Sequence, residues 1–126
     1  MASPQRIIML AEDTDDIRYL VKIMLEMKGY RVVEAANGRQ ALDRAAEEHP
    51  DLIFMDLSMP ILNGWEAARQ LRLNPDTQEI PIVGLSAHCR GGWREEALEA
   101  GCDECIQKPI DDVALDKVLA HYFNQK

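Results

Sequence analysis

Short apolar runs alternate with longer amphipathic stretches along the whole chain, and this alternation constrains the fold more than any other feature. The third run, Leu52–Met55, is apolar without alternation, which is typical of a strand buried on both faces of a parallel sheet. The amphipathic stretches repeat their apolar residues at helical spacing. Alternating strands and helices predict an α/β protein whose parallel sheet carries helices on both faces.

The predicted elements are strands over 7–11, 30–34, 52–55, 80–85 and 104–107, and helices over 15–28, 39–48, 65–73, 93–100 and 111–123. Gly29 and Gly101 are natural C-terminal stops for two of these helices. A chain of 126 residues fits an open five-stranded sheet, because an eight-stranded barrel needs about 250 residues. We therefore expect one domain, residues 1–126, with the doubly wound, flavodoxin-like strand order 2-1-3-4-5.

The first and last helices each carry an apolar set, and in the first helix it recurs at the spacing of one helix face. The set of the first helix is Ile17, Leu20, Val21, Met24 and Leu25, and that of the last is Val113, Leu115, Val118, Leu119 and Tyr122.

The charge balance excludes several classes of partner. Lys and Arg number 14 against 22 Asp and Glu, so the formal net charge is −8. An acidic chain is unsuited to broad nucleic-acid binding or to docking on an anionic membrane. No apolar stretch approaches the roughly 20 residues of a membrane span. We expect a cytoplasmic protein whose three cysteines are reduced thiols.

Polar residues follow four of the five predicted strands. Glu12 and Asp13 follow the first strand, Asp56 the third, Ser86 the fourth, and Lys108 comes just after the fifth. Ligands of open α/β sheets bind beyond the carboxyl ends of the strands, where the winding reverses. The predicted strand order places these side chains at one edge, where they can form a common site.

Three carboxylates at one edge call for a cation, because two like charges about 4 Å apart repel by roughly 4 kcal/mol at an effective dielectric constant near 20. Oxygen ligands without His or Cys favour Mg²⁺. A carboxylate beside Mg²⁺, a Lys and a hydroxyl suits phosphoryl chemistry through an aspartyl phosphate. Taken singly, Asp13 is also consistent with a helix cap, Ser86 with a loop hydroxyl and Lys108 with a solvated lysine.

Four segments together resemble the receiver domain of two-component response regulators: Ile7–Asp13 (IIMLAED), Pro50–Gly64 (PDLIFMDLSMPILNG), Ile82–Ala87 (IVGLSA) and Gly101–Ile110 (GCDECIQKPI). The resemblance covers essentially the whole chain in order and spacing, and implies the CheY-like version of the fold. It implies that Asp56 accepts a phosphoryl group from a histidine kinase or a histidine phosphotransfer protein. It further implies that Ser86 and Lys108 bind the phosphoryl oxygens, and that the Lys108–Pro109 peptide bond is cis.

The resemblance also implies a Mg²⁺ site, held by Glu12 through water, Asp13, Asp56 and the backbone carbonyl of Ser58. Phosphorylation would switch a protein-binding face formed by the last two helices and the last strand. The chain would catalyse only its own phosphorylation and dephosphorylation, so it is not expected to be an enzyme acting on other substrates. Because the sequence ends after the last helix, we expect its output to be contact with a downstream protein target, relay to a phosphotransfer protein, or a domain outside this sequence.

Two other functions remain open at this point. One is a receiver-fold interaction module that no longer uses phosphate. The other is a small Mg²⁺-dependent phosphatase, although such enzymes of the haloacid-dehalogenase type place their Asp nucleophile after the first strand and usually carry a cap domain.

Several positions depart from the family pattern. Cys105 stands where a Tyr or Phe usually couples to the Ser or Thr, which leaves that coupling without its ring. Asn63 replaces a frequent Asp, and Glu12 replaces a commoner Asp. Ser58 and His88 occupy the positions that flank the attacking water, so they should tune the lifetime of the phosphoryl group; His88 is equally consistent with a surface histidine.

Two further features have competing interpretations. Cys102 and Cys105 form a C-x-x-C pair, but a redox or zinc role lacks a following helix start or a second ligand pair. Trp93 follows a glycine pair and is either a half-buried packing residue or an exposed contact for a partner.

Overall fold

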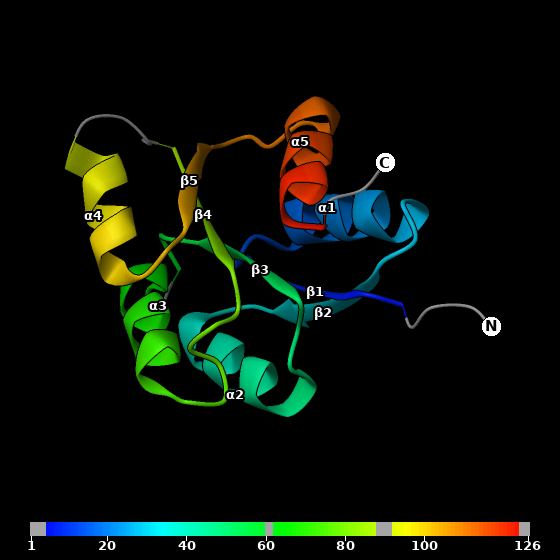
Figure 1. The fold of residues 1–126 in the computed structure, drawn as a ribbon. Coiled ribbons are helices and arrows are strands. Elements are labelled where there is room, and N and C mark those ends of the chain that lie inside the picture. Colours follow the sequence, from blue (N-terminus) through cyan, green and yellow to red (C-terminus); the bar gives the residue numbers. More distant parts are fainter. Residues whose placement is uncertain (1–4, 60–61, 88–91, 124–126) are drawn as a thin grey trace.

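The computed structural model describes residues 5–59, 62–87 and 92–123. Strands and helices alternate along the chain (Figure 1). The strands are β1 (Ile7–Ala11), β2 (Arg31–Ala35), β3 (Leu52–Asp56), β4 (Ile82–Ser86) and β5 (Glu104–Gln107). The helices are α1 (Asp15–Met27), α2 (Gly38–Glu48), α3 (Gly64–Leu73), α4 (Gly92–Ala100) and α5 (Asp112–Phe123).

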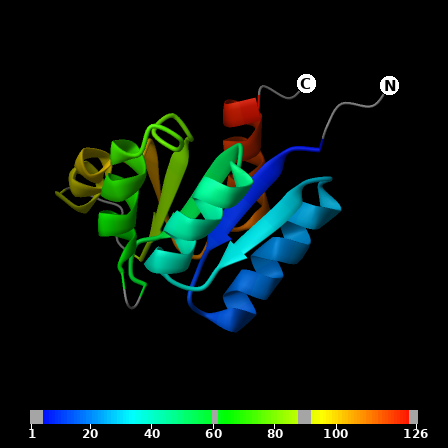
Figure 2. The same ribbon diagram turned by 90° about the horizontal axis from the view of Figure 1, so that it is seen from below.

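All paired strands are parallel, in the order β2-β1-β3-β4-β5. The helices cover both faces of the sheet (Figures 1 and 2). Buried residues of α1 and α5 pack in one core layer, and those of α2, α3 and α4 pack in the other. This arrangement confirms the flavodoxin-like, CheY-like fold and the predicted strand order.

The central strand β3 shows why an unbroken apolar run is a good indicator of a strand in this sheet. All five of its residues are buried, including Asp56 at its end. Each face of the strand meets a different helix layer, so Phe54 packs with the α1 and α5 layer while Ile53 packs with the other. Because both faces of β3 are buried, its side chains are apolar until the strand ends at Asp56.

The strand boundaries were predicted to within two residues, and the largest error is at the start of β4. β4 begins at Ile82, two residues after the predicted start at Ile80. Ile80 still belongs to the preceding turn, where its N–H donates to the carbonyl of Thr77. Pro81 has no N–H, and it only accepts a hydrogen bond, from the N–H of Ile53.

Some members of the apolar sets of α1 and α5 are exposed. Ile17 and Leu20 are 41% and 61% exposed, because they line a pocket beside Lys108 instead of packing under the sheet. Val113 is exposed because it precedes Leu115 by two residues, which places the two on opposite sides of the helix. In α5 the buried residues are Leu115, Val118, Leu119 and Phe123.

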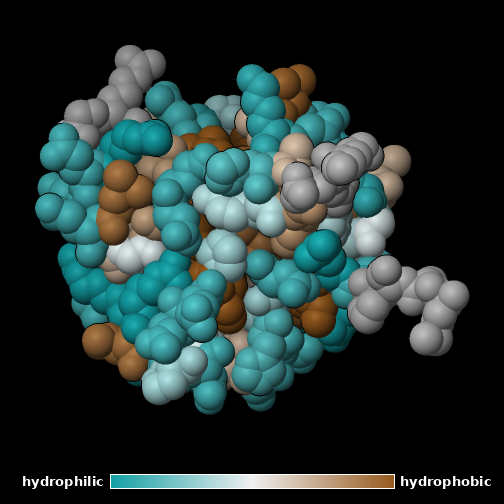
Figure 3. Space-filling model, in the orientation of Figure 1, coloured by the Kyte–Doolittle hydropathy of each residue, from teal (hydrophilic) through white to brown (hydrophobic). Residues whose placement is uncertain are grey.

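The outer surface seen in Figure 3 is mostly hydrophilic, with hydrophobic residues in small separate patches. Among the residues that the structure describes, no helix combines the length and apolarity needed to cross a membrane.

Candidate functional site

The structure brings the predicted site residues together at the carboxyl edge of the sheet. Asp56 is the last residue of β3, Ser86 is the last of β4, and Glu12 directly follows β1. These three side chains belong to residues that are almost fully buried, and they are exceptions in a core that is otherwise mainly apolar. Lys108 directly follows β5 and reaches into the same corner.

The Lys108 ammonium joins two of the carboxylates. Its Nζ lies 3.2 Å from Oδ2 of Asp56 and 3.2 Å from Oε1 of Glu12. Burial opposes the charge on this ammonium, but the two carboxylates outweigh burial and raise the pKa of Lys108. The backbone of Lys108 is held as well, because its N–H donates to the carbonyl of Ser86 at 2.8 Å. Lys108 is therefore a fixed cation beside Asp56.

Asp56 and Glu12 differ in how readily they ionise. Burial opposes the charge on Asp56, yet the N–H of Ser58, which donates to Oδ1 at 3.0 Å, and the neighbouring Glu12 and Lys108 together lower its pKa. Burial, reinforced by the nearby Asp56, raises the pKa of Glu12 to about 6. Asp56 is thus the carboxylate that the surroundings keep ionised, as a nucleophile requires.

The acidic corner fits a hard divalent cation. One carboxylate oxygen each from Glu12, Asp13 and Asp56 lie within 4.8 Å of one another. Oε1 of Glu12 is buried and accepts no hydrogen bond from the described residues, and its neighbour is the Lys108 ammonium at 3.2 Å. A buried oxygen without a hydrogen bond is costly unless a ligand meets it. An all-oxygen donor set of this kind suits Mg²⁺.

Asp13 does not act as a helix cap. The N-cap of α1 is Thr14, which makes no side-chain capping bond, and Asp13 is an exposed member of the carboxylate group. Ser58 is exposed and donates its N–H to Asp56; the metal role of its carbonyl stays a prediction. The Lys108–Pro109 bond is cis, as the resemblance implied. His88 and Cys89 lie outside the described residues.

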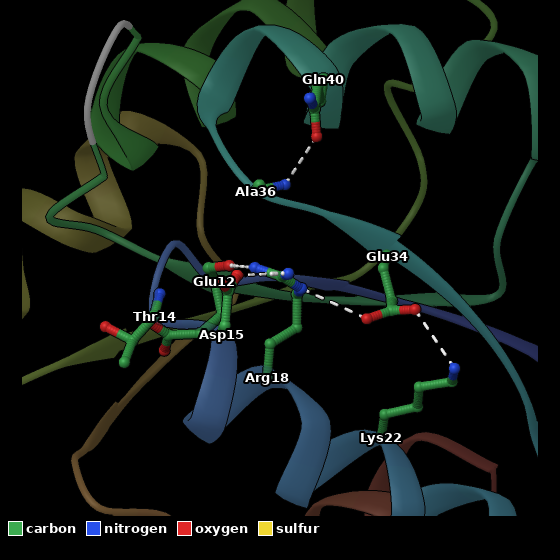
Figure 4. Close-up of polar contacts among 8 residues, drawn as sticks. All are labelled: Glu12, Thr14, Asp15, Arg18, Lys22, Glu34, Ala36 and Gln40. Atoms are coloured by element: carbon green, nitrogen blue, oxygen red, sulfur yellow. Dashed lines mark hydrogen bonds and ion pairs between the residues drawn. The ribbon is translucent and has the colours of Figure 1, made fainter.

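Arg18 of α1 supports the acidic corner through the main chain. Its Nη1 donates to the backbone carbonyl of Glu12 at 2.7 Å, and its other guanidinium nitrogens bind Asp15 and Glu34 (Figure 4). The N–H of Glu12 is held too, by the carbonyl of Ala35. Sequence reasoning missed Arg18, because a single arginine on an amphipathic helix is normally solvated and its spacing carries no signal.

The start of α3 packs directly on the backbone of Asp56. A Cβ added at Gly64 would collide with the Asp56 carbonyl oxygen and the Cα of Leu57, so this position requires glycine. Asn63 caps the helix by accepting a hydrogen bond from the N–H of Glu66 at 2.9 Å. The Asn63–Gly64 pair therefore fixes α3 against the phosphoacceptor candidate.

The cysteines differ from the prediction. Cys105 is disulfide-bonded, so the expectation of three reduced thiols is wrong at this position. Cys102 is a free thiol and is buried, so the two residues of the C-x-x-C pair are not bonded to each other. Burial raises the pKa of Cys102 to about 11, which disfavours a reactive thiolate.

Residues 8–120 match the model of the response regulator receiver domain. The chain belongs to this family. The match covers all five strands and all five helices except for the first residue of β1 and the last three residues of α5, so the fold described above is that of a receiver domain.

Relatives and solved structures that resemble the chain are also response regulators or receiver domains. The chain is 34% identical to the polar-differentiation response regulator DivK of Brucella ovis over 103 residues, which are 82% of this chain and 84% of DivK. It is 32% identical to the receiver domain of the histidine kinase PA1611 of Pseudomonas aeruginosa, with a TM-score of 0.88 over 97% of this chain and all of that one; that structure holds magnesium in its active-site cleft. It is 27% identical to the receiver domain of Ssk1 of Saccharomyces cerevisiae, crystallised with the histidine phosphotransfer protein Ypd1, with a TM-score of 0.86 over 97% of this chain and 91% of that one.

Proposed function

We propose that this receiver domain of a two-component or phosphorelay system accepts a phosphoryl group on Asp56 from a histidine kinase or a histidine phosphotransfer protein. The observation that carries the proposal is the position of Asp56. Its ionised carboxylate lies at the end of a buried strand, 3.2 Å from the Lys108 ammonium and within 4.8 Å of the oxygens of Glu12 and Asp13. This is a nucleophile held beside positive charge and beside a donor set for a cation.

Each residue has a defined part in the transfer. A carboxylate oxygen of Asp56 forms a bond to phosphorus while the bond between phosphorus and the donor's histidine nitrogen breaks, and the electron pair of that bond returns to the imidazole. Lys108 and the Ser86 hydroxyl would contact the phosphoryl oxygens, and the Ser58 N–H keeps the Asp56 carboxyl oriented. Oxygens of Glu12, Asp13, Asp56 and the Ser58 carbonyl would hold Mg²⁺, which supplies positive charge to the phosphoryl oxygens when bound.

The surface beside Lys108 supports docking of such a donor. A pocket of about 310 Å³ lies between α1 and the segment after β5, and its lining is mainly apolar. Ile17 and Leu20 of α1 contribute exposed apolar surface to it, and Glu12 and Lys108 form part of its wall. A helical partner packed on this surface would have its phosphohistidine close to Asp56. The solved complex of the Ssk1 receiver domain with Ypd1 supports this kind of partner.

We further propose that the chain, as a single receiver domain, acts by switching contact with a downstream protein and catalyses only the gain and loss of its own phosphoryl group. An acyl phosphate on Asp56 adds charge and hydrogen-bond acceptors next to Ser86, the last residue of β4. Drawing Ser86 toward that group would shift the end of β4, and we expect this shift to change the position of α4.

Intact-mass spectrometry after incubation with acetyl phosphate and Mg²⁺ tests the proposal. We expect a gain of about 80 Da, the mass of one phosphoryl group, that requires Mg²⁺ and is absent in Asp56→Asn. Asp43→Asn is the matched control, since it makes the same chemical change at an exposed position on α2. No adduct in rapidly quenched samples of the folded protein would contradict the proposal.

That negative result would favour the phosphate-independent interaction module. The observation behind this alternative is Cys105, which is buried and disulfide-bonded where receiver domains usually carry an aromatic ring.

A further inference from the structure

The two tryptophans of the chain meet at a hollow between α3 and α4. These helices lie side by side (Figures 1 and 2), and the ring centroids of Trp65 and Trp93 are 6.2 Å apart with the planes tilted by 39°. Trp93 is 51% exposed. The hollow has a volume of about 360 Å³ and is lined by Asn63, Trp65, Glu66, Arg69, Trp93, Glu96 and Glu99. Tryptophan is among the residues enriched at binding hot spots.

The charged side chains around the indoles are mostly negative. Three of the lining residues are glutamates and one is an arginine. Arg69 pairs with Glu66 on its own helix, at 3.5 Å. In the part of the chain that the structure describes, no cationic group lies within ion-pair distance of Glu96 or Glu99. Aromatic faces and uncompensated carboxylates both attract cations, and both repel nucleic acid and other anions.

We propose that this hollow binds a basic segment of a partner protein, with a Lys or Arg side chain against the indoles and neighbouring basic residues facing Glu96 and Glu99. A cation over an indole face is favoured by roughly 0.5–2 kcal/mol, depending on how far it is desolvated. The carboxylates add attraction at longer range and select basic over acidic segments. An uncharged apolar ligand fits less well, because it would leave the glutamates desolvated without partners.

Both walls of the hollow are attached to the candidate phosphorylation site. The α3 wall starts at Gly64, which packs on the Asp56 backbone, and Glu66 is fixed there by the Asn63 cap. The α4 wall follows β4, which ends at Ser86, and Arg94 of α4 donates to the carbonyl of Cys105 at 3.4 Å. A phosphoryl group that bridges Asp56 and Ser86 would therefore change the relative position of the two walls. This coupling rests on the proposed function; binding to the hollow does not.

A peptide-display library selected against the intact protein tests the binding step. We expect the enriched peptides to carry Lys or Arg next to an apolar residue. Fluorescence anisotropy of one enriched peptide should show about tenfold weaker binding to Trp93→Ala and several-fold weaker binding to Glu96→Gln. Glu95→Gln is the control, because Glu95 is on the same helix but does not line the hollow. No enrichment, enrichment of acidic peptides, or equal binding by all variants would overturn the proposal.

The same titration with acetyl phosphate and Mg²⁺ present tests the coupling. We expect the affinity to change about fivefold or more in the wild-type protein and not in Asp56→Asn. An unchanged affinity in protein that carries the phosphoryl adduct would overturn the coupling. The absence of an adduct would overturn the phosphorylation proposal and leave the binding result standing, so the two failures are distinguishable.

Discussion

Arg18 shows how a residue outside the acidic corner can control its geometry. It binds the Glu12 backbone carbonyl rather than any side chain of the corner, and it is anchored by Asp15 and Glu34 (Figure 4). Because Glu12 and Asp13 follow β1 without an intervening residue, fixing that carbonyl fixes the direction in which both carboxylates leave the strand. The expected effect of Arg18 is on metal affinity.

We expect Arg18→Gln to raise the Mg²⁺ concentration that half-saturates the acetyl phosphate reaction by about tenfold, with little change in the rate at saturating Mg²⁺. Lys22→Gln is the matched control, since Lys22 shares Glu34 with Arg18 but makes no contact with Glu12. Arg18→Lys should restore part of the affinity. Equal weakening in Arg18→Gln and Lys22→Gln would mean that only the charge on α1 matters.

The buried thiol of Cys102 gives a second prediction for a single residue, about how stability and alkylation depend on pH. Burial raises its pKa to about 11, so the folded state disfavours the thiolate. The stability that comes from keeping this group as a neutral thiol is therefore complete below the pKa of the unfolded chain, near 9.0, and is lost as the pH rises through about 11. At pH 8 we expect iodoacetamide to alkylate Cys102 about a hundredfold more slowly in the folded protein than in urea. Peptide mapping would assign the label, and rapid alkylation of folded protein at pH 8 would contradict the burial argument.

At the scale of elements, the N-caps of the helices differ in a way that can be measured. The side chains of Asn37 and Asn63 each accept a hydrogen bond from the first turn of their helix, whereas Thr14 makes no such bond. Asn63→Ala should lower the free energy of unfolding in urea by about 1 kcal/mol, while Thr14→Ala should leave it nearly unchanged. The same loss in both variants would show that the capping bonds are not what stabilises these helix starts.

Strands and helices could be predicted from the sequence where a single physical cause, such as burial on both faces, produced a clear pattern of apolar residues. The strands were predictable because burial on both faces produces an unbroken apolar run, as in Leu52–Met55. Exposure was harder to predict. Helical spacing indicates which residues share a face, but not how far the sheet extends beneath it, so the exposure of Ile17 and Leu20 could not be predicted.

The candidate site was predictable for a different reason. Topology places the carboxyl ends of parallel strands at one edge. The strand order alone therefore predicts that Glu12, Asp56 and Ser86 lie close together. Arg18 could not be found, because its part depends on a contact with a backbone carbonyl, which leaves no pattern in the side chains. The disulfide at Cys105 was missed because pairing among three cysteines follows from spatial proximity rather than spacing.

For the whole molecule, the acidic corner is expected to lower the stability of the metal-free fold while it provides the proposed cation site. Carboxylates of Glu12, Asp13 and Asp56 are gathered within 4.8 Å in a chain whose net charge is already −8. Lys108 compensates two of them, and Asp13 is left as an exposed charge at the same point. The mutual repulsion in such a cluster should destabilise the metal-free fold, and the proposed cation would relieve it.

Mg²⁺ should therefore stabilise the fold by binding the native state. At a Mg²⁺ concentration of about 100 times the dissociation constant, the expected gain is about 2.7 kcal/mol, or roughly 10 °C in the thermal midpoint. We expect Asp13→Asn to lose most of this rise while the metal-free variant is at least as stable as the wild-type protein, because the substitution removes repulsion along with a proposed metal ligand. Thermal unfolding followed by circular dichroism, with and without Mg²⁺, measures both quantities, and Asp43→Asn controls for the change in net charge. A full Mg²⁺-dependent rise in Asp13→Asn would show that the cation binds elsewhere.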